Sequence, residues 1–335
     1  MSAFISLVDI TRRFTSMPPF TERLAKRLTG ERASATVVHA VEGVSLRIAK
    51  GETLGLVGES GCGKSTLGRV AAGILEASMG IAEVAGERVM SAGRKHTTRI
   101  QMVFQDPFAS LNPRMRVGAI IAEGPLAHGL ITKSEAKDDV ARWLAAVGLD
   151  AAAAERFPHQ FSGGQRQRVA VARALAMRPD ALVCDEPVAS LDVSIQAQII
   201  NLFLQLRREL HLTMLFISHD LSVVRHVSDR VAIMYLGRIV EIGPTEAIFA
   251  APRHPYTRAL LDSAPRLAAD GAPEQEIRPI HGELPSPLNP PSGCAFHQRC
   301  PFAQDRCQRE LPLLRPAGEL REAACHFPLE TGSHG

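Results

Sequence analysis

The chain has little net charge, no long apolar run and no recognisable secretion signal, and each absence excludes a class of protein. Its 335 residues carry a formal net charge of +3, which is too small to favour nucleic acid as a partner. No apolar run approaches the roughly 18 residues that a membrane-spanning helix needs. The segment from Met1 to Phe14 has no apolar core of the kind that secretory signals contain. We therefore expect a cytosolic protein that depends on other chains for any work across a membrane.

Alternating strand and helix patterns predict an α/β fold. Hydrophobic residues make up 45% of the chain, and the length favours one large domain with an appendage. Apolar runs predict buried parallel strands, and Gly237 sits within an expected antiparallel hairpin. Residues 15–36 indicate an inserted loop, and residues 107–178 are mostly helical in pattern, with Ser134 as one expected helix cap. The expected strands are 6–10, 44–48, 53–57, 100–104, 181–185, 213–217, 231–235 and 238–241.

A glycine-rich loop follows the strand expected at 53–57. It reads Gly58-Glu59-Ser60-Gly61-Cys62-Gly63-Lys64-Ser65, and its glycines let the backbone curl so that N–H groups point at phosphates. Lys64 adds a point charge, and Ser65 offers a hydroxyl to Mg²⁺ at the positive end of a helix. The pattern predicts a site for a nucleotide and Mg²⁺. Its expected nucleotide-binding residues are Gly58, Ser60, Gly61, Cys62, Gly63, Lys64, Ser65 and Thr66.

A second phosphate-binding element lies further along the chain. Ser162-Gly163-Gly164-Gln165 comes just before a helical pattern, and it presents a hydroxyl and bare backbone N–H groups at the helix N-terminus. This chemistry suits a terminal phosphate, because helix N-termini and exposed backbone N–H groups attract anions. The second element therefore predicts a contact with the terminal phosphate of the bound nucleotide.

Polar side chains at the ends of the expected strands supply the remaining chemistry. Asp185 ends an apolar strand and can reach Mg²⁺, in the simplest case through water. Glu186 follows at once and can orient or deprotonate the attacking water. Gln105 ends the strand expected at 100–104, where its amide can contact both Mg²⁺ and that water. The alternatives are solvated acids and a surface glutamine.

The two phosphate-binding motifs, at this distance from each other, resemble those of ABC-type ATPases. The resemblance implies a P-loop NTPase core with an antiparallel β edge and a helical signature subdomain, and a nucleotide shared between two subunits. It implies that His219 contacts the γ-phosphate and that the loop containing Asp192 carries signals between subunits. It also implies that an aromatic residue near the end of the first strand stacks on adenine. Phe14 is in the right place, and a core phenylalanine is the alternative.

Further motifs resemble the ATPase subunits of dipeptide and oligopeptide importers, particularly the second of the two such subunits. The resemblance implies the cytoplasmic face of the membrane as the site of action. It implies as partners a second homologous ATPase subunit, two integral-membrane permease subunits and an extracytoplasmic solute-binding protein, and it leaves the solute open. The matching runs are Ser110-Leu111-Asn112-Pro113-Arg114, Phe157-Pro158-His159-Gln160-Phe161, Val183 to Val188, Asp192 to Gln198, and His254-Pro255-Tyr256-Thr257.

The composition shifts to Pro, Gly and Cys after Ser263, so we expect an ATPase domain at 1–262 and a small appendage at 263–335. The appendage contains no C-x-x-C pair, and disulfides are uncommon in cytosolic enzymes. Four thiolates can hold an iron–sulfur cluster, and the resemblance implies a four-iron one, while zinc and unligated thiols remain as alternatives. We expect changes here to leave ATP binding nearly intact, because the phosphate loop lies in the other domain. The four cysteines are Cys294, Cys300, Cys307 and Cys325.

Other functions for an ATPase of this type are less consistent with the sequence. Family members that act on DNA carry a long coiled-coil insertion between the two phosphate motifs, and none fits here. Members that act on ribosomes usually carry two ATPase cassettes, and this chain has one. A soluble ATPase with a redox- or metal-sensing role is the remaining alternative, and only the cysteines support it.

Overall fold

The computed structural model describes residues 3–17, 35–263, 280 and 282–330. Most of the loop expected at 15–36 lies outside these residues. The central sheet has the strand order β13-β14-β12-β11-β3-β10-β9-β8. Strands β11, β3, β10, β9 and β8 are mutually parallel, as the apolar runs predicted for β9 and β10. Their bounds are β3 (Thr53–Val57), β8 (Ile100–Val103), β9 (Ala181–Asp185), β10 (Thr213–Ile217), β11 (Arg230–Tyr235) and β12 (Arg238–Pro244).

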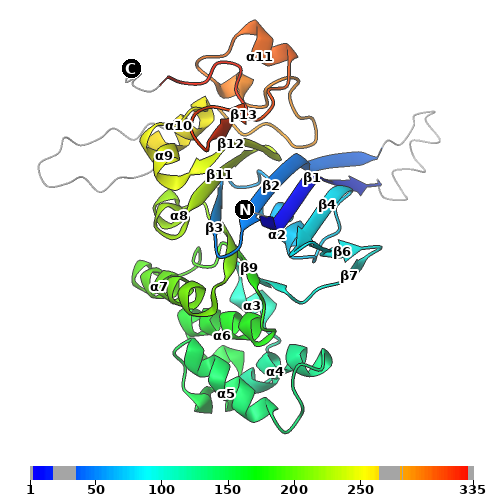
Figure 1. The fold of residues 1–335 in the computed structure, drawn as a ribbon, viewed down its shortest axis with the longest axis vertical. Coiled ribbons are helices and arrows are strands. Elements are labelled where there is room, and N and C mark those ends of the chain that lie inside the picture. The colour runs from blue at the N-terminus through cyan, green and yellow to red at the C-terminus, as the bar shows by residue number, and fades with distance from the viewer. Residues whose placement is uncertain (1–2, 18–34, 264–279, 281, 331–335) are drawn as a thin grey trace, which may run out of the picture.

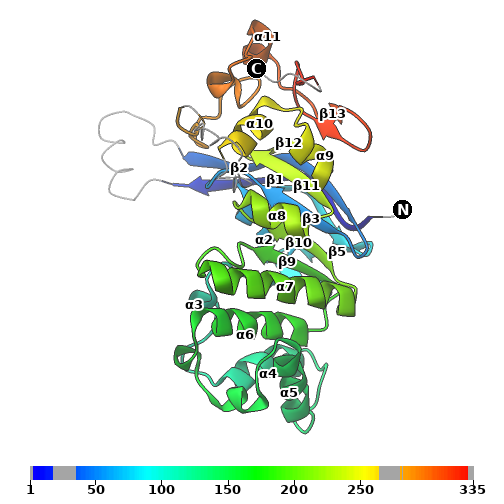
Figure 2. The same ribbon diagram turned by 90° about the vertical axis from the view of Figure 1, so that its left-hand side faces the viewer.

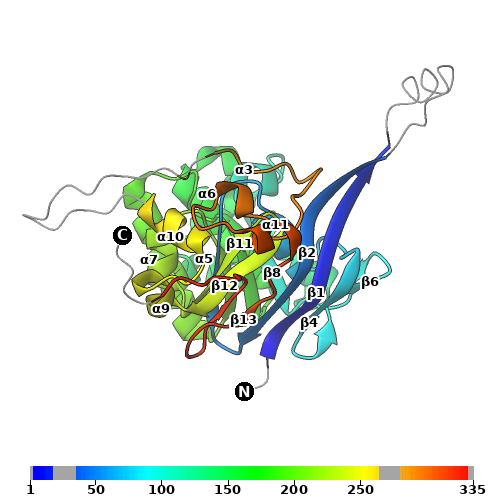
Figure 3. The ribbon, with the colours of Figure 1, turned by 90° about the horizontal axis from the view of Figure 1, so that it is seen from above.

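The hairpin expected around Gly237 is confirmed, because β11 and β12 pair in antiparallel fashion across it. A second, antiparallel sheet has the order β2-β1-β4-β5 and forms the expected β edge (Figure 3). Its first strands are much longer than the sequence pattern indicated, because beyond the core they continue as an exposed ladder paired only with each other. The bounds are β1 (Ala3–Ser16), β2 (Thr36–Ala49), β4 (Met79–Val84) and β5 (Glu87–Arg88), followed by a short hairpin of β6 (Met90–Ser91) and β7 (Arg94–Lys95).

A helical region lies at one end of the molecule, below the central sheet in Figures 1 and 2. It contains α3 (Pro107–Ser110), α4 (Val117–Ala127), α5 (Ala136–Ala146), η1 (Ala151–Glu155), η2 (Pro158–Gln160) and α6 (Gly163–Ala176). Ser134 does not cap α5, contrary to expectation: Glu135 is the residue at the cap, and the Ser134 hydroxyl instead pairs with the Thr132 hydroxyl. Among the described helices, none combines the length and apolar character needed to cross a membrane.

The remaining helices pack near the central sheet and lead into the appendage. They are α2 (Lys64–Ala71), α7 (Val193–Leu210), α8 (Leu221–Val227), α9 (Thr245–Ala250) and α10 (Pro255–Asp262). The appendage contains η3 (His297–Arg299), α11 (Asp305–Arg309), β13 (Arg315–Pro316) and β14 (Glu322–Ala323). Strand β14 pairs antiparallel with β12, so the appendage extends the central sheet of the ATPase core.

An aromatic cluster joins the appendage to the core. Phe296 is 1% exposed, and its ring centroid lies 5.3 Å from those of both Tyr235 and Tyr256. Tyr235 ends β11 and Tyr256 begins α10, so a residue of the appendage completes a core that the ATPase domain starts. Burial of aromatic rings in edge-to-face contact is a strong source of packing energy.

Phe296→Ala is expected to destabilise the chain by about 3–5 kcal/mol, because it leaves a cavity among rings that cannot close over it. Denaturant unfolding followed by tyrosine fluorescence measures the loss. Phe302→Ala is the matched control, since Phe302 lies in the same appendage but is 53% exposed. Equal, small effects from both substitutions would contradict a shared core.

Candidate nucleotide site

The phosphate loop joins the end of β3 to the start of α2. Gly63 has φ +107°, and a Cβ there would lie 2.1 Å from the Ala40 carbonyl oxygen, so only glycine fits. Lys64 is 4% exposed, and its Nζ donates to the carbonyl oxygens of Gly58 (2.8 Å) and Glu59 (2.9 Å). The loop thus curls around the ammonium group and holds it where a phosphate can replace its carbonyl partners.

The two oxygen groups predicted for Mg²⁺ lie side by side. Ser65 Oγ donates to Asp185 Oδ1 over 2.8 Å, which joins the start of α2 to the end of β9. Asp185 is 2% exposed, and burial raises the pKa of its carboxyl, although the Ser65 hydrogen bond opposes the shift. Hydroxyl and carboxylate oxygens are the ligands that Mg²⁺ prefers, so this pair fits the ion.

Glu186 lies where the ends of three parallel strands meet. Gln105 Nε2 donates to Glu186 Oε2 over 3.0 Å, and His219 Nδ1 lies 3.3 Å from the same oxygen. The three residues follow β9, β8 and β10, which are adjacent in the sheet. The Glu186 backbone has φ +45°, a conformation that costs energy in a residue with a Cβ, and its N–H is held by the Ile217 carbonyl. The structure therefore brings together the residues predicted for hydrolysis.

The second phosphate motif caps α6. Ser162 Oγ accepts a hydrogen bond from the Gln165 N–H at 3.3 Å, and Gln165 Oε1 accepts one from the Ser162 N–H at 3.1 Å. A Cβ on Gly164 would lie 2.5 Å from Ile195 of α7, so packing requires glycine there for a reason the motif did not indicate. The corresponding contact for Gly163 is 3.3 Å from Leu191.

The second motif belongs to the helical region, whereas the phosphate loop belongs to the core (Figure 1). Asp192 lies at the N-terminus of α7, and its side chain makes no capping hydrogen bond there. The neighbouring Val193 is 81% exposed. The role of the Ser162–Gln165 motif and of Asp192 at a subunit contact stays a prediction.

Phe14 lies on the exposed ladder of β1 and β2. Its side chain is 38% exposed, so the alternative of a core phenylalanine is wrong. The Arg12 guanidinium carbon lies 4.7 Å from the centre of its ring. Adenine stacking on Phe14 stays a prediction.

A group of residues around Glu59 has no signal in the sequence. The Glu59 N–H donates to Tyr256 Oη over 3.0 Å, and Arg299 of the appendage donates to both Glu59 carboxylate oxygens. The appendage therefore contacts the phosphate loop directly, which argues against the expectation that changes in the appendage leave ATP binding nearly intact. The run His254-Pro255-Tyr256 now has a local explanation, because His254 Nδ1 caps α10 by accepting from the Tyr256 N–H. No sequence pattern indicated Arg299.

The four appendage cysteines line one small cavity of about 10 Å³, together with His254, Phe296 and His297. Burial raises the pKa of the Cys300 and Cys325 thiols to about 11, and it also raises the pKa of Cys294. In the described part of the chain, no group of three or more His, Cys, Asp or Glu side chains has the geometry to hold a metal ion. Cys62 and Cys184 are buried elsewhere in the chain.

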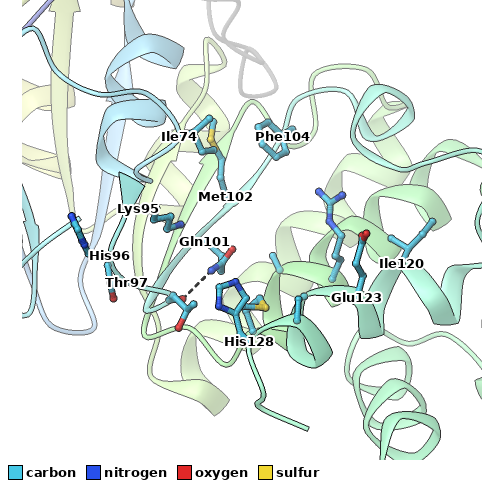
Figure 4. Close-up of a pocket in the computed structure, with 16 residues that line it drawn as sticks. Ile74, Lys95, His96, Thr97, Gln101, Met102, Phe104, Ile120, Glu123 and His128 are labelled. Atoms are coloured by element: carbon cyan, nitrogen blue, oxygen red, sulfur yellow. Dashed lines mark hydrogen bonds between the residues drawn. The ribbon is translucent and has the colours of Figure 1, made fainter. Parts of the chain in front are cut away.

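A larger cleft separates the core from the helical region (Figure 4). Its volume is about 640 Å³, and residues of β8, α4 and α6 contribute to its walls. Phe104, which precedes Gln105, lines the cleft, so one wall leads directly to the site around Glu186. Lys95 also lines it, and its Nζ donates to the Ile100 carbonyl over 2.8 Å.

Comparisons with known proteins agree with this geometry. The family model for the ABC transporter matches residues 41–189, and that for the oligopeptide/dipeptide transporter C-terminal region matches residues 240–307. The structure of cbiO1 from Clostridium perfringens, part of the ABC transporter complex cbiONQ, has a TM-score of 0.59 and 26% identity. That likeness covers 75% of this chain and 92% of cbiO1.

Sequence relatives match over nearly the full length. The oligopeptide transport ATP-binding protein AppF of Bacillus subtilis is 47% identical over 96% of this chain and 97% of its own length. The di/tripeptide transport ATP-binding protein DppF of Pseudomonas aeruginosa is 48% identical over 86% of this chain and 90% of its own. The oligopeptide transport ATP-binding protein OppF of Escherichia coli is 50% identical over 82% of this chain and 84% of its own length. The chain belongs to the ABC transporter ATPases, in the family of the oligopeptide and dipeptide transport ATP-binding proteins.

Proposed function

We propose that this chain hydrolyses ATP to power the uptake of peptides or similar small solutes through an ABC importer. The observation that carries the proposal is the convergence of Gln105 and His219 on Glu186. Glu186 directly follows the strand whose last residue, Asp185, pairs with Ser65 of the phosphate loop. Full-length similarity to peptide transport ATPases supports the solute class.

Each residue has a role that its position supports. Lys64 and the N–H groups of the phosphate loop bind the phosphates, while Ser65 and Asp185 would hold the Mg²⁺ that neutralises phosphate charge. Glu186 accepts the proton of the attacking water. Gln105 and His219 orient the Glu186 carboxylate, and His219 is 58% exposed and so able to reach a terminal phosphate.

A second ATPase subunit completes the site in this proposal. Ser162 is exposed at the N-terminus of α6, away from the chain's own phosphate loop, and it offers a hydroxyl to a nucleotide held by a partner. Val193, beside Asp192, is an apolar side chain that such a partner would cover. The physiological partner is a homologous ATPase subunit of the same family.

Two integral-membrane permease subunits and an extracytoplasmic solute-binding protein are the other partners, which places the chain at the cytoplasmic face of the membrane. We assign the 640 Å³ cleft to a short cytoplasmic segment of a permease subunit. The cleft presents apolar side chains such as Phe104 beside the charged groups of Lys95 and Glu123 (Figure 4). Because Phe104 adjoins Gln105, which donates to Glu186, movement of the permease segment would change the position of the Glu186 carboxylate.

A four-iron cluster is the ligand that we propose for the appendage cysteines. All four thiols line one cavity although they are spread over the sequence, which supports a common ligand. No group among the described residues has the geometry to hold a metal ion, so the shared cavity and the family resemblance alone support the cluster.

Cys300→Ser is expected to lower the iron and acid-labile sulfide content of anaerobically purified protein, because it removes one of four ligands. The wild-type protein should be brown, with broad absorption in the visible. Cys184→Ala is the matched control, since Cys184 is buried in β9, outside the cavity. Protein that contains zinc but no iron would indicate a structural zinc site in place of the cluster. Protein that contains neither metal would indicate that the four thiols are unligated.

Peptide uptake in the source cells tests the proposed function. Deletion of the gene should abolish uptake of labelled di- or oligopeptides, and the wild-type gene should restore it whereas the Glu186→Gln gene should not. The protein should also co-purify with integral-membrane chains. If the deletion strain took up all peptides normally while the protein still co-purified with membrane chains, the transported solute would belong to another class than peptides. If the protein were found without membrane chains, a soluble regulator would be favoured.

A further inference from the structure

An ion pair connects the appendage to the phosphate loop. Arg299 Nη1 and Nη2 donate to the two carboxylate oxygens of Glu59 over 2.7 and 2.9 Å. The Arg299 side chain is only 6% exposed, and Glu59 is 22% exposed. A two-pronged arginine–carboxylate pair fixes direction as well as distance, so it holds the Glu59 side chain in one orientation.

Further contacts hold the guanidinium of this ion pair in place. Arg299 Nη1 also donates to Tyr235 Oη at 3.3 Å, and its guanidinium lies 5.9 Å from the Tyr235 ring centre. Tyr235 and Tyr256 are themselves in ring contact at 4.6 Å. The charged group of the appendage thus contacts one ring of an aromatic pair in the ATPase core.

Glu59 transmits this contact to the nucleotide-binding groups. Its N–H is held by Tyr256 Oη, and its carbonyl oxygen accepts from Lys64 Nζ at 2.9 Å. The same residue therefore touches Arg299 through its side chain and Lys64 through its backbone. A change in the position of Arg299 would shift the loop that carries the phosphate-binding N–H groups.

The position of Arg299 depends on the cysteine segment. Cys300 follows it directly, and the Arg299 N–H donates to the Phe296 carbonyl at 3.0 Å within a short 3-10 turn. The first residue of the turn, His297, donates its N–H to the Cys294 carbonyl at 3.0 Å, and the Cys294 N–H donates to the Cys307 carbonyl at 2.7 Å. Cysteines that line the cavity therefore bracket the residue that reaches the phosphate loop.

We infer that Arg299 is a positioning residue for the phosphate loop, and that the cysteine segment sets the ATP affinity of this chain through the Glu59–Arg299 pair. The inference depends on ATP binding at the loop. It does not depend on which solute is imported or on which ligand the cysteines hold.

A double-mutant cycle tests the pair, with the dissociation constant of a fluorescent ATP analogue measured on the purified full chain. Arg299→Gln and Glu59→Gln should each weaken binding by roughly 3- to 100-fold, and the double variant should bind about as well as either one, because contacting residues are not additive. In hydrolysis assays KM should rise more than kcat falls. Arg306→Gln is the control, since Arg306 pairs with Glu310 on the exposed surface of the same appendage.

A purely structural role for Arg299 would lower the melting temperature without changing the affinity, and that result overturns the inference. Arg299→Lys is the second variant if Arg299→Gln does not fold, because lysine keeps the charge but loses the two-pronged contact. The link to the cysteines is tested with Cys300→Ser, which should weaken ATP binding in the wild-type background and have little further effect in Arg299→Gln. Equal effects in both backgrounds would show that the cysteine segment acts by another route.

Discussion

Glu186→Gln is expected to lower the rate of ATP hydrolysis by roughly 10²- to 10⁴-fold while ATP binding stays nearly unchanged. The amide can still accept the hydrogen bond that Gln105 donates to Glu186 at 3.0 Å, so the geometry is kept. It cannot accept a proton from water, so the chemical step is lost. The ATP-bound, closed assembly of two subunits should therefore accumulate.

Phosphate release at saturating ATP measures the rate, and size-exclusion chromatography with ATP measures the assembly. Glu246→Gln is the matched control, because Glu246 is an exposed residue whose ion pair with Arg225 lies outside the site. Turnover by Glu186→Gln close to that of the wild type would remove Glu186 from the role of general base.

Lys64→Ala is expected to weaken ATP binding by roughly 10- to 100-fold, the range that follows from losing hydrogen bonds of a charged donor. Lys64 is 4% exposed, and its ammonium lies within the curve of the loop, where phosphate oxygens take over from the carbonyls of Gly58 and Glu59. The substitution also leaves those carbonyls without this donor. Because the larger loss is the contact with phosphate, the affinity for ATP should fall by more than the free energy of unfolding.

Equilibrium binding of a fluorescent ATP analogue measures the loss, and thermal unfolding without nucleotide serves as the stability check. Lys50→Ala is the control, since Lys50 is exposed and carries the same charge. If Lys64→Ala bound ATP as tightly as Lys50→Ala, the loop would hold nucleotide by its backbone alone.

The sequence predicted the parts of the fold in which local patterns and tertiary structure agree. The apolar runs at β9 and β10 are buried throughout and could only be central strands. Because parallel strands end at one edge of a sheet, the polar residues that follow them were bound to meet. This explains why Gln105, Glu186 and His219, the last of which was assigned by the resemblance alone, converge in the fold.

The rest depends on contacts that leave no local pattern. Arg299 and Glu59 are 240 residues apart, and each looks like a surface charge in its own segment. The length of β1 and β2 was missed because their exposed ends pair with each other, so burial does not alternate there. The spacing of the cysteines alone did not show that they converge; the resemblance implied it, and the fold around Phe296 brings them to one cavity.

The pairing of β14 with β12 has a consequence for how the ATPase core can be produced. A strand at the edge of a sheet exposes unpaired N–H and C=O groups, and such an edge recruits other chains. Here very short strands of the appendage cover β12, and Phe296 covers the rings of Tyr235 and Tyr256. A chain cut after Asp262 would keep every nucleotide motif yet uncover both surfaces. We therefore expect such a chain to aggregate more readily than the full chain.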